Sequence, residues 1–104
     1  MYFAKIDTAS SADLVALVAN RKIRVIGYTL VAASAVTAKF QSGGSTDLTG
    51  AMSLITGVPL SPHSDARLPA GVIGLFETNI GEKLNLVLGS GVQVSGHLAY
   101  VLVN

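Results

Sequence analysis

The chain has 104 residues, of which 50% are hydrophobic and only 12% are charged, with a formal net charge of +1 and no cysteine. This length fits one domain over residues 1–104, and the charged fraction is about half that of ordinary soluble domains, so we expect the protein to associate. The near-neutral charge argues against a nucleic-acid partner, and the lack of cysteine excludes disulfides and thiolate chemistry.

The apolar residues are not arranged as a membrane span. The longest strongly apolar run without charge, residues 25–38, is shorter than the roughly 18 to 20 residues that a spanning helix needs. The longer uncharged stretch 84–104 is interrupted by polar residues at strand-like intervals. No basic start followed by an apolar block marks a signal peptide. We therefore expect no membrane partner.

Valine, isoleucine, threonine and tyrosine dominate the long runs, and clusters of glycine, serine, asparagine and aspartate separate them, which is typical of strands and turns. About eight short strands indicate an all-β fold, either an antiparallel sandwich or a barrel. A helix over residues 10–20 is the less favoured alternative for the second strand. The predicted strands are, in chain order, residues 2–7, 14–19, 22–32, 36–41, 48–55, 72–77, 83–88 and 92–103.

Two of the predicted strands, the third and the last, are apolar on both faces. In the third, Ile26, Tyr28 and Leu30 are expected to face one way and Ile23 and Val25 the other. One face can form the core, and the second needs another cover, because contiguous exposed apolar patches mark interaction sites. We expect a homo-oligomer built on strand faces. The candidate residues for the interface between subunits or for the core are Ile26, Tyr28, Leu30, Leu98, Tyr100 and Leu102.

The glycine-rich segments do not match phosphate-binding motifs. In a P-loop, four residues separate two glycines, and Lys and then Ser or Thr follow the second glycine. In this chain five residues separate Gly44 from Gly50, and Ala51 takes the place of the lysine. Residues 42–45 are instead predicted to form a hairpin turn. Residues 89–91 lack the third glycine of a dinucleotide fingerprint and are also predicted to form a turn.

The titratable residues do not form a recognisable catalytic or metal-binding set. His63, Ser64 and Asp65 are consecutive in a predicted loop, where adjacent side chains cannot generally form a relay. His97 alternates with small residues on a strand, and two distant histidines are too few for a metal site. Carboxylates of the predicted turn 77–82 and of Asp47 could converge at glycosidase separation, but strand-end polarity explains each of them better. We expect no enzyme activity, no cofactor and no small-molecule substrate.

One basic cluster and one long loop remain as candidate contact regions. Arg21, Lys22 and Arg24 are the only clustered basic residues, and they either solubilise the start of a strand or contact a partner. Residues 61–71 contain two prolines, which cannot donate to a strand ladder, and loops of this length are often functional.

Several segments carry a resemblance to a known family. The chain resembles the trimeric jelly-roll proteins that decorate the heads of tailed bacteriophages, often called cement or decoration proteins, and the resemblance runs in order from residue 14 to residue 103. Related chains have a short loop in place of residues 61–71. The matching segments are residues 22–28, 40–43, 48–54, 75–78, 81–86 and 94–101.

The resemblance implies a structural virion protein on the outer surface of the capsid. The chain would be an antiparallel jelly roll that forms a homotrimer and binds the major capsid protein where capsid subunits meet. It implies no catalytic or metal-binding residue. The candidate contacts with the capsid are Arg21, Lys22, Arg24, His63, Asp65 and Arg67.

A host-glycan-binding jelly-roll module of a phage head or tail fibre is the alternative function. Such a module predicts an exposed aromatic platform or a pocket of acidic and amide side chains. The chain has no tryptophan, and Tyr2, Tyr28 and Tyr100 are its only tyrosines, so aromatic material for sugar binding is scarce.

Overall fold

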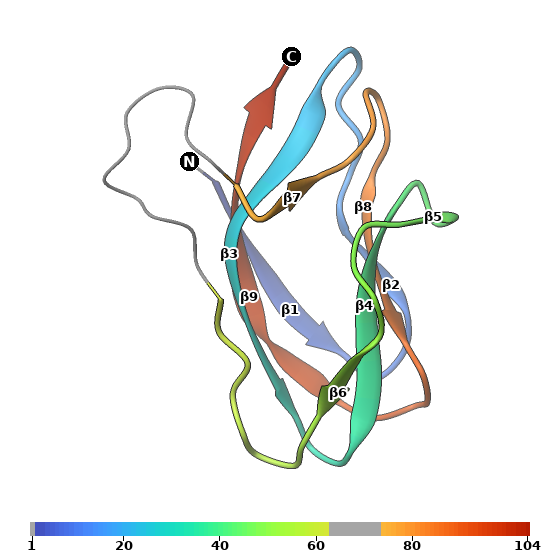
Figure 1. Ribbon diagram of the computed structural model, residues 1–104, viewed down its shortest axis with the longest axis vertical. Coiled ribbons are helices and arrows are strands. Elements are labelled where there is room, and N and C mark those ends of the chain that lie inside the picture. Colours follow the sequence, from blue (N-terminus) through green and yellow to red (C-terminus); the bar gives the residue numbers. More distant parts are fainter. Residues whose placement is uncertain (1, 63–73) are drawn as a thin grey trace.

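The computed structural model describes residues 2–62 and 74–104, and these form two antiparallel sheets that face each other (Figure 1). The described residues contain nine strands and no helix, which confirms the expected all-β sandwich. The strands are β1 (Tyr2–Thr8), β2 (Ala12–Val15), β3 (Lys22–Ala32), β4 (Val36–Ser42), β5 (Thr46–Asp47), β6 (Met52–Leu54), β7 (Phe76–Glu77), β8 (Leu84–Leu88) and β9 (Val94–Val103).

The strands pair in a nested order from the ends of the chain inward. Strand β1 pairs with β9, β2 with β8, β3 with β7, and β4 with both β5 and β6, all antiparallel. Two further pairings, β9 with β3 and β8 with β4, join these strand pairs into two sheets. The four-stranded sheet therefore has the order β1-β9-β3-β7, and the five-stranded sheet has the order β2-β8-β4-β5, with β6 also on β4.

Three predicted strands differ clearly from the observed ones. The strand expected at residues 14–19, like the alternative helix at 10–20, is wrong: β2 ends at Val15, and the chain turns at Asn20, which has a φ of 63°. Of the strand expected at residues 72–77, only Phe76 and Glu77 form a strand, β7, among the described residues 74–77. The strand expected at residues 48–55 is also wrong in its bounds, since only β6 lies within it and β5 precedes it. Between them the side-chain oxygen of Thr49 accepts a hydrogen bond from the backbone of Phe40, so a side chain replaces one step of the ladder.

The hairpin expected at residues 42–45 is confirmed. Gly43 and Gly44 adopt φ values of 66° and 82°, which few other residues tolerate, and they join β4 to β5. The turn expected within residues 77–82 is also present, with Gly81 at a φ of 73°. These turns depend on local chemistry, which explains why the sequence predicts them.

A β-bulge interrupts β3 and changes which side chains share a face. Val25 pairs with Tyr100 and Gly27 with Ala99, so Ile26 has no partner on β9. The extra residue reverses the alternation of inward and outward side chains along β3. Inward-facing side chains before and after the bulge therefore enter the same core. The expectation that Ile23 and Val25 face away from Tyr28 and Leu30 is therefore wrong, since all four are buried in the same cluster.

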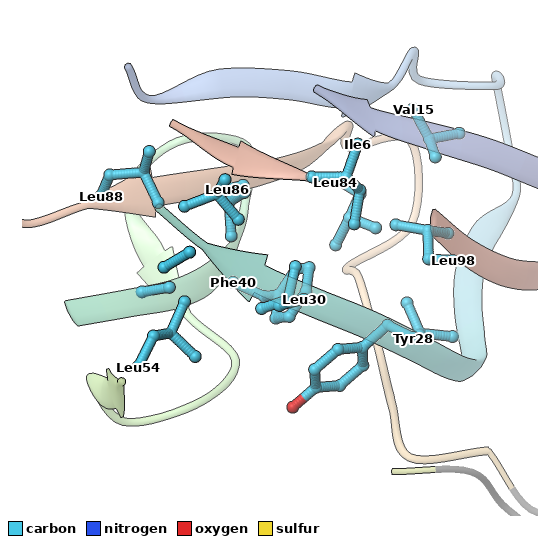
Figure 2. Packing of buried hydrophobic residues seen from close by; sticks show 14 of the residues in the cluster. Ile6, Val15, Tyr28, Leu30, Phe40, Leu54, Leu84, Leu86, Leu88 and Leu98 are labelled. Atoms are coloured by element: carbon cyan, nitrogen blue, oxygen red, sulfur yellow. The ribbon is translucent and has the colours of Figure 1, made fainter. Parts of the chain in front are cut away.

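The core fills the space between the two sheets (Figure 2). Phe40 of the five-stranded sheet lies at its centre, fully buried, with its ring 4.8 Å from that of Tyr28 and 5.1 Å from that of Phe76 in the opposite sheet. Leucines of both sheets, including Leu30 and Leu86, surround these rings. Burial of each large side chain contributes about 1.5–3 kcal/mol, so the sandwich is held together mainly by this contact between its sheets.

Candidate functional site

The outer faces of the two sheets differ in polarity. On the five-stranded sheet, polar side chains alternate with the buried ones, and two ion pairs cover the face: Lys39 with Asp47 at 3.2 Å and Lys83 with Asp13 at 3.0 Å. This is the expected pattern for a sheet with one solvated face. The outer face of the four-stranded sheet carries charged side chains too, but apolar ones lie next to one another on β1 and β9, and this face is therefore the better candidate for a contact.

We call the apolar part of that face the outer strip, and it consists of Phe3, Ala99, Val101 and Val103. Phe3 lies opposite Ala99 in the β1–β9 register and is 72% exposed. The three residues of β9 alternate with Leu98, Tyr100 and Leu102, which face the core, so they point outward. The strip presents an uncharged apolar surface across two neighbouring strands.

An ion-pair cluster borders the outer strip. Both Lys22 and Arg24 bind Glu77: the Nζ of Lys22 is 3.0 Å from Oε2, and Arg24 donates from Nε and from a terminal nitrogen to Oε1 at 3.1 and 2.9 Å. These bonds, first that of Lys22 and then that of Arg24, hold the pKa of Glu77 below its usual value. Two cations of the predicted basic cluster are thus engaged within the chain.

Arg21, the third member of the basic cluster, lies in a different setting. It is exposed, and it makes no ion pair with any described residue. Its backbone N–H bonds to Val18, and its carbonyl accepts a 2.8 Å hydrogen bond from Gly81, so the two turns that end the sandwich here are fastened side by side.

These two turns carry a second apolar surface, which we call the apolar tip: Leu17, Val18 and Ile80. Leu17 and Ile80 are 56% and 57% exposed. The tip was not predicted from the sequence, because Leu17 and Val18 were expected in a strand and the turn at residues 77–82 was expected to be polar. The signal that could have found it is the occurrence of large apolar residues inside both turns. Apolar side chains at exposed turns mark a contact site.

A third exposed apolar pair lies at the opposite end of the sandwich. Ile55 and Val58 flank a turn in which the N–H of Gly57 bonds to the carbonyl of Ala32, the last residue of β3. The apolar tip lies beyond the first residue of the same eleven-residue strand. The two apolar ends are therefore separated by the full length of β3, and they can be tested independently.

The predicted interface or core residues occupy several positions. Tyr28, Leu30 and Leu98 lie in the core, Tyr100 and Leu102 pack against it, and Ile26 is buried at the bulge. His63, Asp65 and Arg67, and with them most of the long loop 61–71, lie outside the described residues.

The described carboxylates do not resemble a catalytic pair. Glu77 is bound by Lys22 and Arg24, Glu82 accepts hydrogen bonds from Ser42 and Asn79, and Asp47 accepts them from Gln41 and Lys39. The pKa of each of these three carboxyl groups is lowered, chiefly by those hydrogen bonds. A glycosidase acid requires a raised pKa, which none of these three carboxyls has.

Residues 2–62 and 74–104 contain no group of three or more His, Cys, Asp or Glu side chains placed to hold a metal ion. Nor do they form a helix long and apolar enough to cross a membrane.

Comparisons with known proteins add no assignment. The chain matches no family model, no curated protein and no solved structure.

Proposed function

We propose that the protein is a capsid decoration, or cement, protein: a structural virion protein that binds the outer surface of a tailed-phage head as a homotrimer and stabilises the shell. The observation that carries this proposal is the presence of two separate apolar surfaces, the outer strip on a sheet face and the apolar tip at a loop end. A decoration protein needs two such surfaces, one for its own subunits and one for the capsid.

The strand order supports a jelly roll as the finer description of the sandwich. The nested pairing, first strand with last and second with second last, is what results when one long antiparallel ribbon is folded over into two sheets. Jelly rolls have this double-sheet Greek-key arrangement, and they are common in viral capsid proteins. The fold is compatible with many functions, so the assignment depends on the surfaces.

The outer strip is the proposed contact between subunits of the trimer. It is uncharged, and it presents Phe3 beside the smaller Ala99, so a neighbouring chain can pack against the exposed ring. A ring of three requires a heterologous contact, in which the strip of one copy meets a different patch of the next. The low charge of the whole chain provides little repulsion against such an assembly.

The apolar tip, with Arg21 beside it, is the proposed contact with the major capsid protein. Glu77 engages Lys22 and Arg24, which leaves Arg21 as the member of the basic cluster best placed to reach a carboxylate on the shell. A trimer presents three tips at once. Binding across subunit junctions favours the assembled lattice by mass action, because the bound protein stabilises only the state that it binds.

Particles lacking the protein provide the test. They should assemble with normal diameter but release DNA at a lower temperature, and added purified protein should restore their heat resistance. The variant Leu17→Ser/Ile80→Ser should fold and yet fail to restore it, whereas Val58→Ser, at the opposite end, should restore it. Failure of such particles to form, or normal heat resistance combined with loss of adsorption to cells, would contradict the proposal.

No described feature favours the host-glycan alternative. Tyr2 and Phe3 are both exposed, but they are consecutive in β1 and therefore point to opposite faces of the sheet. Tyr2 moreover stacks on Tyr100, with ring centroids 5.4 Å apart. These aromatic side chains do not form a common platform for a sugar.

A further inference from the structure

Strand β1 forms an open edge of the four-stranded sheet. It has seven residues, pairs with β9 on one side, and is the last strand in the order of its sheet. Exposed strand edges present unpaired N–H and C=O groups that can accept another strand, and proteins commonly block them with short strands, prolines or bulges. The β1–β9 register runs through all seven residues without a shift, and β1 contains no proline.

The hydrogen bonds of β3 establish toward which neighbouring strand each residue directs its backbone N–H and C=O groups. Leu30 and Leu60 exchange two backbone hydrogen bonds of 2.9 Å on the side of β3 that faces away from β9. Because bond direction alternates along an antiparallel strand, the neighbouring Thr29 bonds to β9, at its partner His97. On β9, His97 thus uses its backbone groups toward β3.

The same alternation identifies the groups at the open edge. Since His97 bonds to β3, its partner on β1, Lys5, directs its N–H and C=O away from β9. Phe3 and Asp7, two residues to either side, do the same. Ala4 and Ile6 bond to β9. The edge therefore offers three pairs of backbone groups, and none of these bonds to another described segment.

Two of these edge residues carry charges that have no opposite charge within the described chain. Lys5 makes no ion pair with a described residue, and neither does Asp7, which accepts a hydrogen bond from the neutral amide of Gln93 through Oδ1 alone. The side chains of Lys5 and Asp7 share one face of the strand, and both residues are exposed. One cation and one anion are thus available side by side.

We infer that the β1 edges of two copies pair antiparallel about a two-fold axis at Ile6, forming one continuous sheet. In this register Lys5 of each copy lies opposite Asp7 of the other, and each such pair exchanges two backbone hydrogen bonds. An axis at Lys5 would oppose two ammonium groups, and an axis at Asp7 would oppose two carboxylates. An axis at Ala4 would leave both charges without an opposite partner. Charge complementarity therefore selects Ile6.

This contact goes beyond the proposed trimer. A three-fold contact uses two different patches, whereas a two-fold contact uses the same edge on both chains. The β1 pairing therefore links copies that belong to different trimers.

A charge-swap cycle tests the inference on the full chain. Lys5→Asp and Asp7→Lys should each weaken the two-fold association, measured by sedimentation equilibrium, by about tenfold or more, because each places like charges opposite one another twice per dimer. The double variant Lys5→Asp/Asp7→Lys should restore it. A double variant as weak as the single ones, or a wild type without a two-fold step up to millimolar concentration, would overturn the inference.

Amide hydrogen exchange gives a second measurement that is specific to this edge. The amides of Lys5 and Asp7 should become protected as the wild-type concentration rises, whereas those of Ala4 and Ile6 should be protected at every concentration and in every variant, which also reports that β1 is folded. Protection that never extends to Lys5 and Asp7 in the associated protein would show that another surface is used. Loss of capsid binding alone would affect the proposed function and not this result.

Discussion

Val25 and Tyr28 face the same core although they lie three residues apart on one strand, because Ile26 between them has no partner on β9. Without this bulge, one of the two side chains would point out of the sandwich. The bulge therefore combines two apolar sets of β3 in one core. The apolar pattern of β3 therefore does not by itself indicate an oligomer. The apolar residues of the outer strip support the expectation of an oligomer instead.

The outer strip can be tested by introducing a charge. Val101→Glu should shift the protein from trimer toward monomer, because a carboxylate in the centre of the strip would be desolvated by the neighbouring chain. Light scattering at micromolar concentration measures the mass. Val87→Glu is the matched control, since Val87 has the same outward position on a central strand of the other sheet, opposite Lys39. A monomeric wild type, or equal loss of mass in both variants, would contradict the prediction.

Gly96, in β9, should tolerate no side chain. Its φ is 150°, and a Cβ there would fall on the carbonyl oxygen of Thr29 in the adjacent strand. Gly96→Ala should lower the free energy of unfolding by about 1–3 kcal/mol or more, measured by urea denaturation. Gly50→Ala, where a Cβ meets no atom within 4 Å, should change it by less than about 0.5 kcal/mol. Equal effects would show that the backbone at β9 can relax.

Thr78 should stabilise the start of β3 through one hydrogen bond. Its buried Oγ1 accepts a 2.9 Å hydrogen bond from the backbone N–H of Ile23, which is also buried. Thr78→Val keeps the shape but leaves that N–H without a partner, so the free energy of unfolding should fall by about 1–3 kcal/mol. Thr78→Ser keeps the acceptor and should lose less. A larger loss in the serine variant, measured by thermal unfolding, would indicate that packing of the methyl group dominates.

Glu77 should make stability depend on pH in the acidic range. Lys22 and then Arg24 lower its pKa in the folded protein, so its contribution is complete above the unfolded-state pKa of roughly 4.3 and is lost as the pH falls through the lower folded-state value. Glu77→Gln should therefore be less stable than the wild type at neutral pH, and the difference should shrink below about pH 4.

The difference in melting temperature between wild type and Glu77→Gln, followed from pH 7 downward, isolates this effect, because the other carboxyl groups are common to both proteins. A difference that stays constant with pH would mean that Glu77 acts through its shape or its neutral hydrogen bonds rather than through its charge.

The class of fold and its sharpest turns can be predicted from local residue patterns alone. Alternating apolar residues and β-branched runs predicted an all-β fold, either a sandwich or a barrel, and the structure is a sandwich. The glycines at 43 and 44 predicted the hairpin, because a residue without a Cβ tolerates a positive φ. The long strands β3, β4, β8 and β9 were placed to within two residues for the same reason: each is a local pattern long enough to be read without its partners.

Which faces are buried and which side chains share a surface depends on contacts between segments that are distant in the chain. The bulge at Ile26 exists because β9 supplies one residue fewer than β3 at that point, and no pattern within β3 records it. The apolar tip likewise joins two turns some sixty residues apart, and the hydrogen bond between Gly81 and Arg21 holds them together. Lys22 and Arg24, which form a basic cluster in the sequence, both pair with the carboxylate of Glu77 because β7 pairs with β3. These relationships depend on strand register, which is set by contacts between distant segments rather than by the composition of any one of them.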